Sequence, residues 1–419
     1  METTTGSTGS AVHWPSAIQF GLSLLAFTML ITSGLGLAAA GLIQYFSEPG
    51  QEAEGLSLLL RSAGLVLPAL LVLPSAFYAL LRLLKPGERP AAGGFRLRLP
   101  WALLILAFPL VLWLGNSVVD LRFAAPFLLP LLHLLAIGLP VLWLLHLALR
   151  RLPLGSPQRA WGVFAAGLVL SPALIIVLEL VALMAVILIA VVFITLQPEL
   201  AEELQELARR FPAGGQDPEA LLEELAPFLS RPLVIYGALV YVAGIVPLIE
   251  EALKPLGVWL LVRRNLSPAA GFAAGALSGA GYALFESLAL ATGGGEEWAF
   301  QAFIRSGTGI IHIVTTGLTG YALALAWREN RYVRLGIAYL LSVTLHGLWN
   351  GLTVLFSFGS LLEGIGAESL PLLERVVPAF PFAIAYLALT GFVLLLLGNR
   401  LLRRPAALPE SAPTPESPL

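Results

Sequence analysis

Ten long apolar runs are the feature that most constrains what this chain can fold into. They cover residues 16–45, 62–84, 99–119, 124–149, 160–196, 232–262, 268–291, 298–326, 335–357 and 376–399. A helix of about 20 apolar residues crosses the roughly 30 Å hydrocarbon core of a bilayer. The composition agrees, because only 12% of the residues are charged, against about 25% in soluble domains. We predict an all-α polytopic membrane protein with about ten transmembrane helices and the lipid bilayer as its solvent.

The distribution of basic residues predicts the orientation of these helices. Sixteen of the 24 Lys and Arg residues lie in alternate connections, at residues 82–98, 150–159, 263–264, 328–334 and 400–404. Seven lie in the other connections: Arg61, Arg122, Arg209, Arg210, Arg231, Arg305 and Arg375. Cytoplasmic connections of membrane proteins are enriched in Lys and Arg. The asymmetry predicts a multi-pass protein of the cytoplasmic (inner) membrane with both termini in the cytosol.

The fifth run, residues 160–196, is long enough for either one extended helix or two spans. Glu179 interrupts it, but no Gly or Pro provides a turn at that point. As one helix the run would be about 55 Å long, whereas a second crossing would invert every later connection against the charge bias. We predict one long helix, with Glu179 solvated near the outer surface.

Charged residues inside the sixth run require an explanation. Glu250, Glu251 and Lys254 lie in the stretch VPLIEEALKPLGVWLLVRR, and a charge in hydrocarbon costs at least ~2.5 kcal/mol. Helical spacing places both carboxylates within reach of the one ammonium, at i,i+4 and i,i+3. A single Glu–Lys pair can also be a structural contact between helices.

The next three runs carry further polar residues at a similar depth. Tyr282 precedes Glu286 by one turn, His312 lies in the eighth run, and His346 and Asn350 share one face of the ninth. Counted at 1.5 Å per residue, the polar groups of these four runs lie about 18–28 Å from the inner ends. Tyr282 alone is typical of a packing residue. Unpaired Glu and His would be costly in hydrocarbon, so the set predicts a polar catalytic cavity within the helix bundle.

The residue types limit the chemistry of such a cavity. The chain has no Cys, no GxSxG motif and no HExxH motif, so thiol or serine nucleophiles lack support. Carboxylates, imidazoles and an amide are suited to hydrolysis by activated water. Glu and His are also zinc ligands, and a catalytic zinc needs three protein ligands with one open position.

Four motifs follow one another in this part of the chain: EEALK, YALFE, a His in the next apolar run, and HGLWN. This ordered set resembles the PrsW-type intramembrane proteases. They form a superfamily with the type II CAAX prenyl proteases and bacteriocin-immunity-type (CPBP) proteins. The corresponding family motifs are EExxK or EExxxR, an aromatic residue followed after three positions by Glu or His, a lone His, and HxxxN or HxxxD. The resemblance covers about residues 232–357.

The resemblance implies an enzyme that cleaves a peptide bond within the membrane. Glu250 and Glu251 would hold the water-activating carboxylate, with Lys254 as their charge partner. His346 and Asn350 would stabilise the oxyanion and transfer protons. The full set of implied catalytic residues is Glu250, Glu251, Lys254, Tyr282, Glu286, His312, His346 and Asn350.

The resemblance leaves the metal open, because PrsW proteins are described as metalloproteases whereas the CAAX relatives resemble glutamate-activated enzymes. If zinc is bound, the expected ligands are Glu251, Glu286, His312 and His346. We favour a mechanism that requires no metal cofactor, because Lys254 already supplies positive charge beside the Glu pair and would repel a cation.

The expected partner is a membrane protein substrate, and no nucleic acid partner is expected. Family precedent indicates a single-span regulatory protein, such as an anti-sigma factor. One alternative function is a proton-coupled transporter, which also buries Glu, Lys and His, although runs one to five show no repeat of the site, as an inverted-repeat transporter would. The other alternative is a catalytically silent membrane scaffold of the same superfamily.

These patterns divide the chain into six expected segments. They are a disordered N-terminus (1–15), an N-terminal membrane domain of five spans (16–196), an acidic amphipathic outer segment (197–231), a catalytic four-helix core (232–357), an outer loop with the final span (358–404) and a disordered tail (405–419). Two short helices are expected in the outer segment, separated at residues 212–215. The outer segment either covers an entrance at the membrane surface or is a solvated connection.

Overall fold

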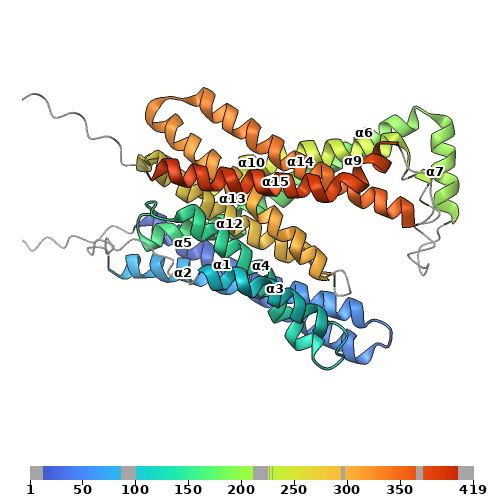
Figure 1. The fold of residues 1–419 in the computed structure, drawn as a ribbon, viewed down its shortest axis with the longest axis horizontal. Helices are drawn as coiled ribbons and strands as arrows, with labels where there is room; N and C mark the ends of the chain where they lie inside the picture. The colour runs from blue at the N-terminus through green and yellow to red at the C-terminus, as the bar shows by residue number, and fades with distance from the viewer. Residues whose placement is uncertain are drawn as a thin grey trace, which may run out of the picture.

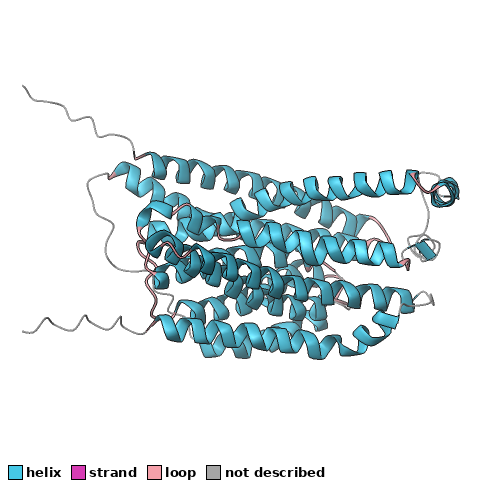
Figure 2. Ribbon diagram, turned by 90° about the horizontal axis from the view of Figure 1, so that it is seen from above, coloured by secondary structure: helices cyan, strands magenta, loops and turns pink. Residues whose placement is uncertain are grey.

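Helices make up all of the regular structure in the described part of the chain. The computed structural model describes residues 13–85, 101–210, 225, 227–228, 230–293, 298–364 and 371–403, and no strand occurs within them (Figures 1 and 2). The predicted all-α fold is therefore confirmed. The first helix begins at Trp14, just inside the segment predicted as disordered. Otherwise the two predicted disordered termini, and most of the second predicted outer helix, lie outside the described residues.

The elements follow one another with these bounds. They are α1 (Trp14–Ser47), α2 (Glu52–Leu84), α3 (Trp101–Val118), α4 (Ala125–Leu149), α5 (Pro157–Ala165), η1 (Ala166–Leu170), α6 (Ser171–Thr195), α7 (Pro198–Arg210), α9 (Pro232–Leu239), η2 (Val240–Ile245), α10 (Val246–Leu253), α11 (Leu256–Trp259), η3 (Val262–Arg264), α12 (Pro268–Leu290), α13 (Trp298–Glu329), α14 (Tyr332–Gly364) and α15 (Pro371–Leu402). Here η1 and η2 are π-helical turns and η3 is a 3₁₀ turn.

Eight of the ten predicted spans are helices long and apolar enough to cross a membrane. The other two are α3, whose apolar stretch Leu103–Val118 is shorter, and α12, which is rich in Gly and Ala. The low hydropathy of α12 has a physical reason. Most of its side chains are buried between other helices, so small residues that allow close packing replace the large apolar residues that face lipid.

The fifth run forms one continuous helical segment, as predicted. Residues Pro157–Thr195 run through α5, η1 and α6 without a turn at Glu179. Most of α6 is exposed and apolar, as expected for a helix surrounded by lipid.

Helix ends that belong to the predicted inner connections meet at one end of the bundle. The Asn399 side-chain amide donates to Ala148 O at 2.8 Å and to Arg150 O at 3.1 Å, which joins the ends of α15 and α4. The Gln158 amide donates to Ser16 Oγ at 2.8 Å, which joins the starts of α5 and α1. The short connection between α4 and α5 takes part in both contacts, so α1 begins and α15 ends at the same end of the molecule.

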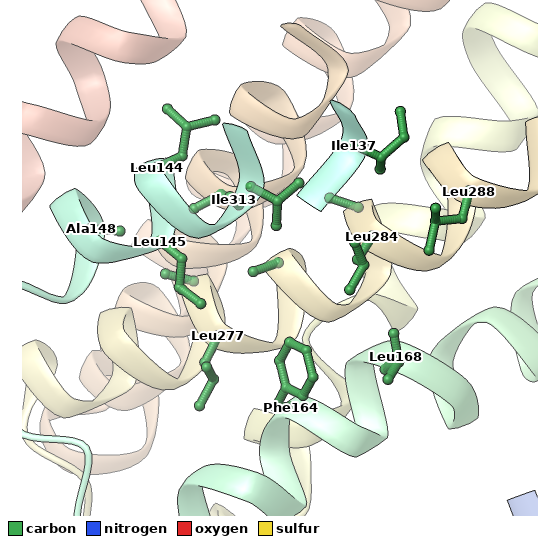
Figure 3. Close-up of a cluster of buried hydrophobic side chains, with 14 of the residues drawn as sticks. Ile137, Leu144, Leu145, Ala148, Phe164, Leu168, Leu277, Leu284, Leu288 and Ile313 are labelled. Atoms are coloured by element: carbon green, nitrogen blue, oxygen red, sulfur yellow. The ribbon is translucent and has the colours of Figure 1, made fainter. Parts of the chain in front are cut away.

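A single core connects the first half of the chain to the second. Side chains of α12 pack against α4 on one side and against α5 and η1 on the other (Figure 3). The labelled core residues are Ile137, Leu144, Leu145, Ala148, Phe164, Leu168, Leu277, Leu284, Leu288 and Ile313. The helix α12 therefore lies between the N-terminal helices and α13.

The GxxxGxxxG row of α12 allows its backbone to approach α13 closely. A Cβ added at Gly271, Gly275 or Gly279 would overlap a backbone oxygen of α13. At Gly279 that oxygen belongs to His312 and would lie 2.5 Å away. Close packing along this row therefore fixes where the His312 backbone lies.

Candidate active site

The buried ammonium of Lys254 lies at the centre of the candidate site. Its Nζ atom is 2.7 Å from Glu250 Oε2, 2.9 Å from Glu251 Oε1, 2.8 Å from His312 Nδ1 and 3.2 Å from His346 Nδ1. The lysine side chain is fully buried. The predicted convergence of the sixth, eighth and ninth runs is thus present, and Lys254 is the residue that connects them.

The backbone around Lys254 is held in place by the end of α10 and by α12. The helix α10 ends just before Pro255, which has no N–H group with which to continue the ladder. Ser278 Oγ of α12 donates to Lys254 O at 2.6 Å. The carbonyl freed at the helix end therefore has a partner, and the lysine is fixed relative to α12.

A second chain of contacts leads from His312 to Arg305. The Glu286 carboxylate pairs with His312 Nε2 through one oxygen and with Arg305 Nη2, at 3.0 Å, through the other. Because His312 Nδ1 faces Lys254, this ring is fixed at both nitrogens. Glu286 therefore orients His312, as carboxylates commonly do for functional imidazoles.

Arg305 is a site residue that the sequence analysis assigned to an outer connection. It lies within α13, and its side chain is only 17% exposed. A signal was available in the sequence, because Arg305 precedes His312 by seven residues, which places both on one face of a helix.

The tautomer of His346 can be assigned from the number of donors around it. The Lys254 ammonium has three N–H groups but four polar neighbours, of which His346 Nδ1 is the most distant. We therefore assign the three N–H groups to the other neighbours. His346 Nδ1 lies 3.1 Å from Glu251 Oε1, in position to donate to it. His346 Nε2 is then left as an acceptor, 3.8 Å from Glu250 Oε2.

Tyr282 lies against the same cluster. Lys254 Nζ is 4.7 Å from the centre of its ring, a cation–π contact, and Glu250 and Glu286 are close enough to interact electrostatically with its hydroxyl group. The ring centre of His312 is 5.2 Å from those of both Tyr282 and His346, in edge-on arrangements. Tyr282 is therefore more than a packing residue, because its ring contacts the buried charge of the site.

Asn350 shares a helix face with His346 but points to a different partner. Its amide donates to Val242 O of η2 at 3.2 Å. Next to it, a Cβ on Gly347 would overlap Ala243 O, so α14 packs closely on this π-helical turn. One amide N–H of Asn350 thus holds η2, directly before the Glu pair of α10. Its role toward an oxyanion stays a prediction.

The prediction that Glu179 is solvated at the outer surface is wrong. One of its carboxyl oxygens is buried without a hydrogen-bond partner among the described residues, Glu250 is close enough to interact with it electrostatically, and the Tyr241 hydroxyl donates to its backbone oxygen at 2.8 Å. The sequence signal was its depth, because Glu179 is twenty residues from Arg159, or about 30 Å at 1.5 Å per residue. This depth is close to that predicted for Glu286.

The group that could hold a metal shares two residues, His312 and His346, with the predicted zinc ligands. Ligand atoms of Glu250, His312 and His346 lie within 4.8 Å of one another. Of the other two predicted ligands, Glu286 is paired with Arg305 and His312. Glu251 is not part of the triplet formed by Glu250, His312 and His346.

This triplet does not fit a zinc ion in the observed arrangement. The Lys254 ammonium lies 2.7 to 3.2 Å from all three of its members, whereas zinc needs ligand distances of about 2.0–2.2 Å. Two cations would repel each other strongly in this buried space. The side chains have suitable donor atoms, but they are arranged around an ammonium group.

A comparison with family models gives one match to this part of the chain. Residues 219–386 match the model of the PrsW family intramembrane metalloprotease. No curated protein and no solved structure gives a significant match. The matched segment contains all eight predicted site residues and Arg305, but not Glu179. The predicted resemblance is confirmed, and it supports a protease that acts within the membrane.

Proposed function

We propose that this chain, a PrsW-type intramembrane protease over residues 219–386, hydrolyses a peptide bond of a membrane-embedded protein by carboxylate-activated water. The observation that supports this reaction is the buried cluster of two carboxylates, one ammonium and two imidazoles. General base catalysis needs a carboxylate or imidazole within reach of a water molecule, and this cluster supplies both.

Glu250 is the better candidate for the base of the pair. Its side chain is 6% exposed, whereas that of Glu251 is fully buried between Lys254 and His346. Glu250 Oε2 and His346 Nε2 are two acceptors 3.8 Å apart, a separation that one water molecule can bridge. A water held there would lose a proton to Glu250 as its oxygen attacks the substrate carbonyl.

The remaining groups have supporting roles in this proposal. Lys254 and Glu251 provide the opposite charges beside the base. Glu286, paired with Arg305, holds the His312 ring in place. His346 Nε2 accepts from the attacking water and orients it, the second N–H of Asn350 donates to the oxyanion of the tetrahedral intermediate, and the proton taken by Glu250 is returned to the leaving nitrogen.

Cleavage by the purified protein is the direct test of this function. Incubation with a library of single-span peptides in lipid, followed by mass spectrometry, should give new termini within an apolar segment. The Glu250→Gln protein serves as the control for contaminating proteases. Intact peptides with the wild-type protein would contradict the proposal, and proton flux through reconstituted vesicles would favour the transporter instead.

Zinc dependence is a separate prediction of the proposed mechanism. We expect cleavage to survive stringent chelation, and the purified protein to contain no stoichiometric zinc, because the Lys254 ammonium occupies the space among the three candidate ligands. Elemental analysis measures the metal content. About one zinc per chain, with activity lost on chelation and restored by zinc, would contradict the metal-free mechanism.

The expected substrate is a single-span regulatory protein, such as an anti-sigma factor, in the cytoplasmic membrane. We propose that both termini of the protease are cytosolic, from the bias of its basic residues and from the shared position of the α1 and α15 ends. Reporter fusions at Arg89, Asp217, Asn330 and the C-terminus should read in, out, in and in. A cytosolic reading at Asp217 would reject this topology.

A further inference from the structure

The helix α6 contacts the rest of the protein along one narrow stripe. Pro172 and Ile175 are buried and Glu179, Ala182 and Val186 are half-buried, whereas the residues between them are exposed. Intervals of three and four residues follow one face of a helix. Glu179 is therefore part of the inward face, although the helix is otherwise directed toward lipid.

The groups that Glu179 meets belong to the candidate active site. Glu250, Glu286 and Lys254 are close enough to interact electrostatically with its carboxyl group, and one of its carboxyl oxygens is buried without a hydrogen-bond partner among the described residues. Tyr241 of η2 holds its backbone through the 2.8 Å hydrogen bond to its carbonyl oxygen. These neighbours belong to α10 and the residue after it, to α12 and to η2. Three elements of the site therefore surround the Glu179 side chain.

The proximity of Glu179 to Glu250 has a specific physical consequence. A carboxyl group on a lipid-facing helix is costly unless it has a polar partner. Two carboxyl groups in contact repel each other if both are ionised, so a hydrogen bond between them uses one shared proton. Such a bond would restrict the rotamer of Glu250, whose Oε2 atom also lies 2.7 Å from Lys254 Nζ and 3.8 Å from His346 Nε2.

We propose that Glu179 is a positioning residue of the catalytic site, which holds the Glu250 carboxyl in its reactive orientation through a hydrogen bond supplied by α6. Glu179 lies outside residues 219–386, the segment that matches the family model. The N-terminal half of the chain therefore completes the site. This inference rests on the proposed function of Glu250 as the base.

Three substitutions separate the hydrogen bond from charge and bulk. Glu179→Gln keeps the length and a donor, Glu179→Asp keeps the carboxyl group but withdraws it by one methylene, and Glu179→Leu removes the polar group. With the peptide that the wild-type protein cleaves fastest, we expect kcat to fall about 10- to 100-fold for the Asp and Leu variants. The Gln variant should stay close to wild type, and KM should be unchanged in all three. Val181 lies two residues after Glu179 but on the exposed side of α6. The variant Val181→Leu is therefore the matched control and should behave as wild type.

A second measurement is independent of activity. Thermal unfolding in detergent of Glu179→Leu, Glu250→Leu and the double variant forms a double-mutant cycle, which should be non-additive if the two side chains interact. Additive effects, a Gln variant as slow as the Leu variant, or a raised KM with unchanged kcat would each overturn the proposal. If the wild-type protein cleaves no peptide, the proposed function fails, while the cycle still decides whether Glu179 holds Glu250.

Discussion

Glu250→Gln is expected to reduce peptide cleavage by about 10²- to 10⁴-fold, which is the usual contribution of a general acid or base. The amide has nearly the same size as the carboxylate, so the substitution keeps the packing of α10 but cannot accept a proton from water. Glu250 is the less deeply buried member of the pair, with its side chain 6% exposed, and its Oε2 atom lies 3.8 Å from His346 Nε2. The measurement is single-turnover cleavage of a peptide found in the library, with membrane insertion and thermal stability recorded in parallel.

Two further variants are compared with Glu250→Gln, one at a second residue of the site and one outside it. Glu251→Gln should also reduce cleavage, because it weakens the contacts of Lys254 and His346. Glu329→Gln, at the exposed end of α13 where the carboxylate pairs with Arg331, should leave cleavage unchanged. If Glu250→Gln, Glu251→Gln and the variant with both substitutions all cleave as the wild type does, then the water is activated elsewhere.

Lys254→Met is expected to destabilise the helix bundle by about 3–5 kcal/mol, the cost of removing one partner of a buried ion pair. Met is similar to Lys in length, so little packing is lost. The loss comes from charge, because two carboxylates and two imidazoles then face a buried apolar group. Thermal unfolding in detergent measures the change, and cleavage should be lost as well.

A compensating substitution tests this explanation. Lys254→Met combined with Glu251→Gln removes one positive and one negative charge, so it should recover much of the lost stability but no activity. A Lys254→Met protein as stable as the wild type would show that the ammonium does not hold the cluster together. A Lys254→Met protein that binds zinc and still cleaves would instead show that the site is a metal centre.

Much of the fold follows from local patterns in the sequence. All ten predicted spans are helices, because about 20 apolar residues in hydrocarbon must satisfy their backbone groups within one segment. The long fifth helix was also predictable, since the absence of a turn at Glu179 is a local feature. The same holds for the face of α12 that packs closely on α13, since the Gly row is a local feature too. The i,i+3 and i,i+4 contacts between Lys254 and its two Glu partners follow from the same helical period.

The structure of the site depends on how separate helices are rotated and packed, which no local period specifies. Spacing within α13 indicates that Arg305 and His312 share a face, but only the packing of α12 against α13 gives both of them Glu286 as a partner. Two of the four expected zinc ligands, Glu251 and Glu286, lie outside the group of Glu250, His312 and His346 for the same reason: depth alone cannot show which side chains meet across a bundle. The inward direction of Glu179 is likewise a property of tertiary packing. An apolar helix has no preferred face in its sequence, so the neighbouring helices decide which of its residues is buried.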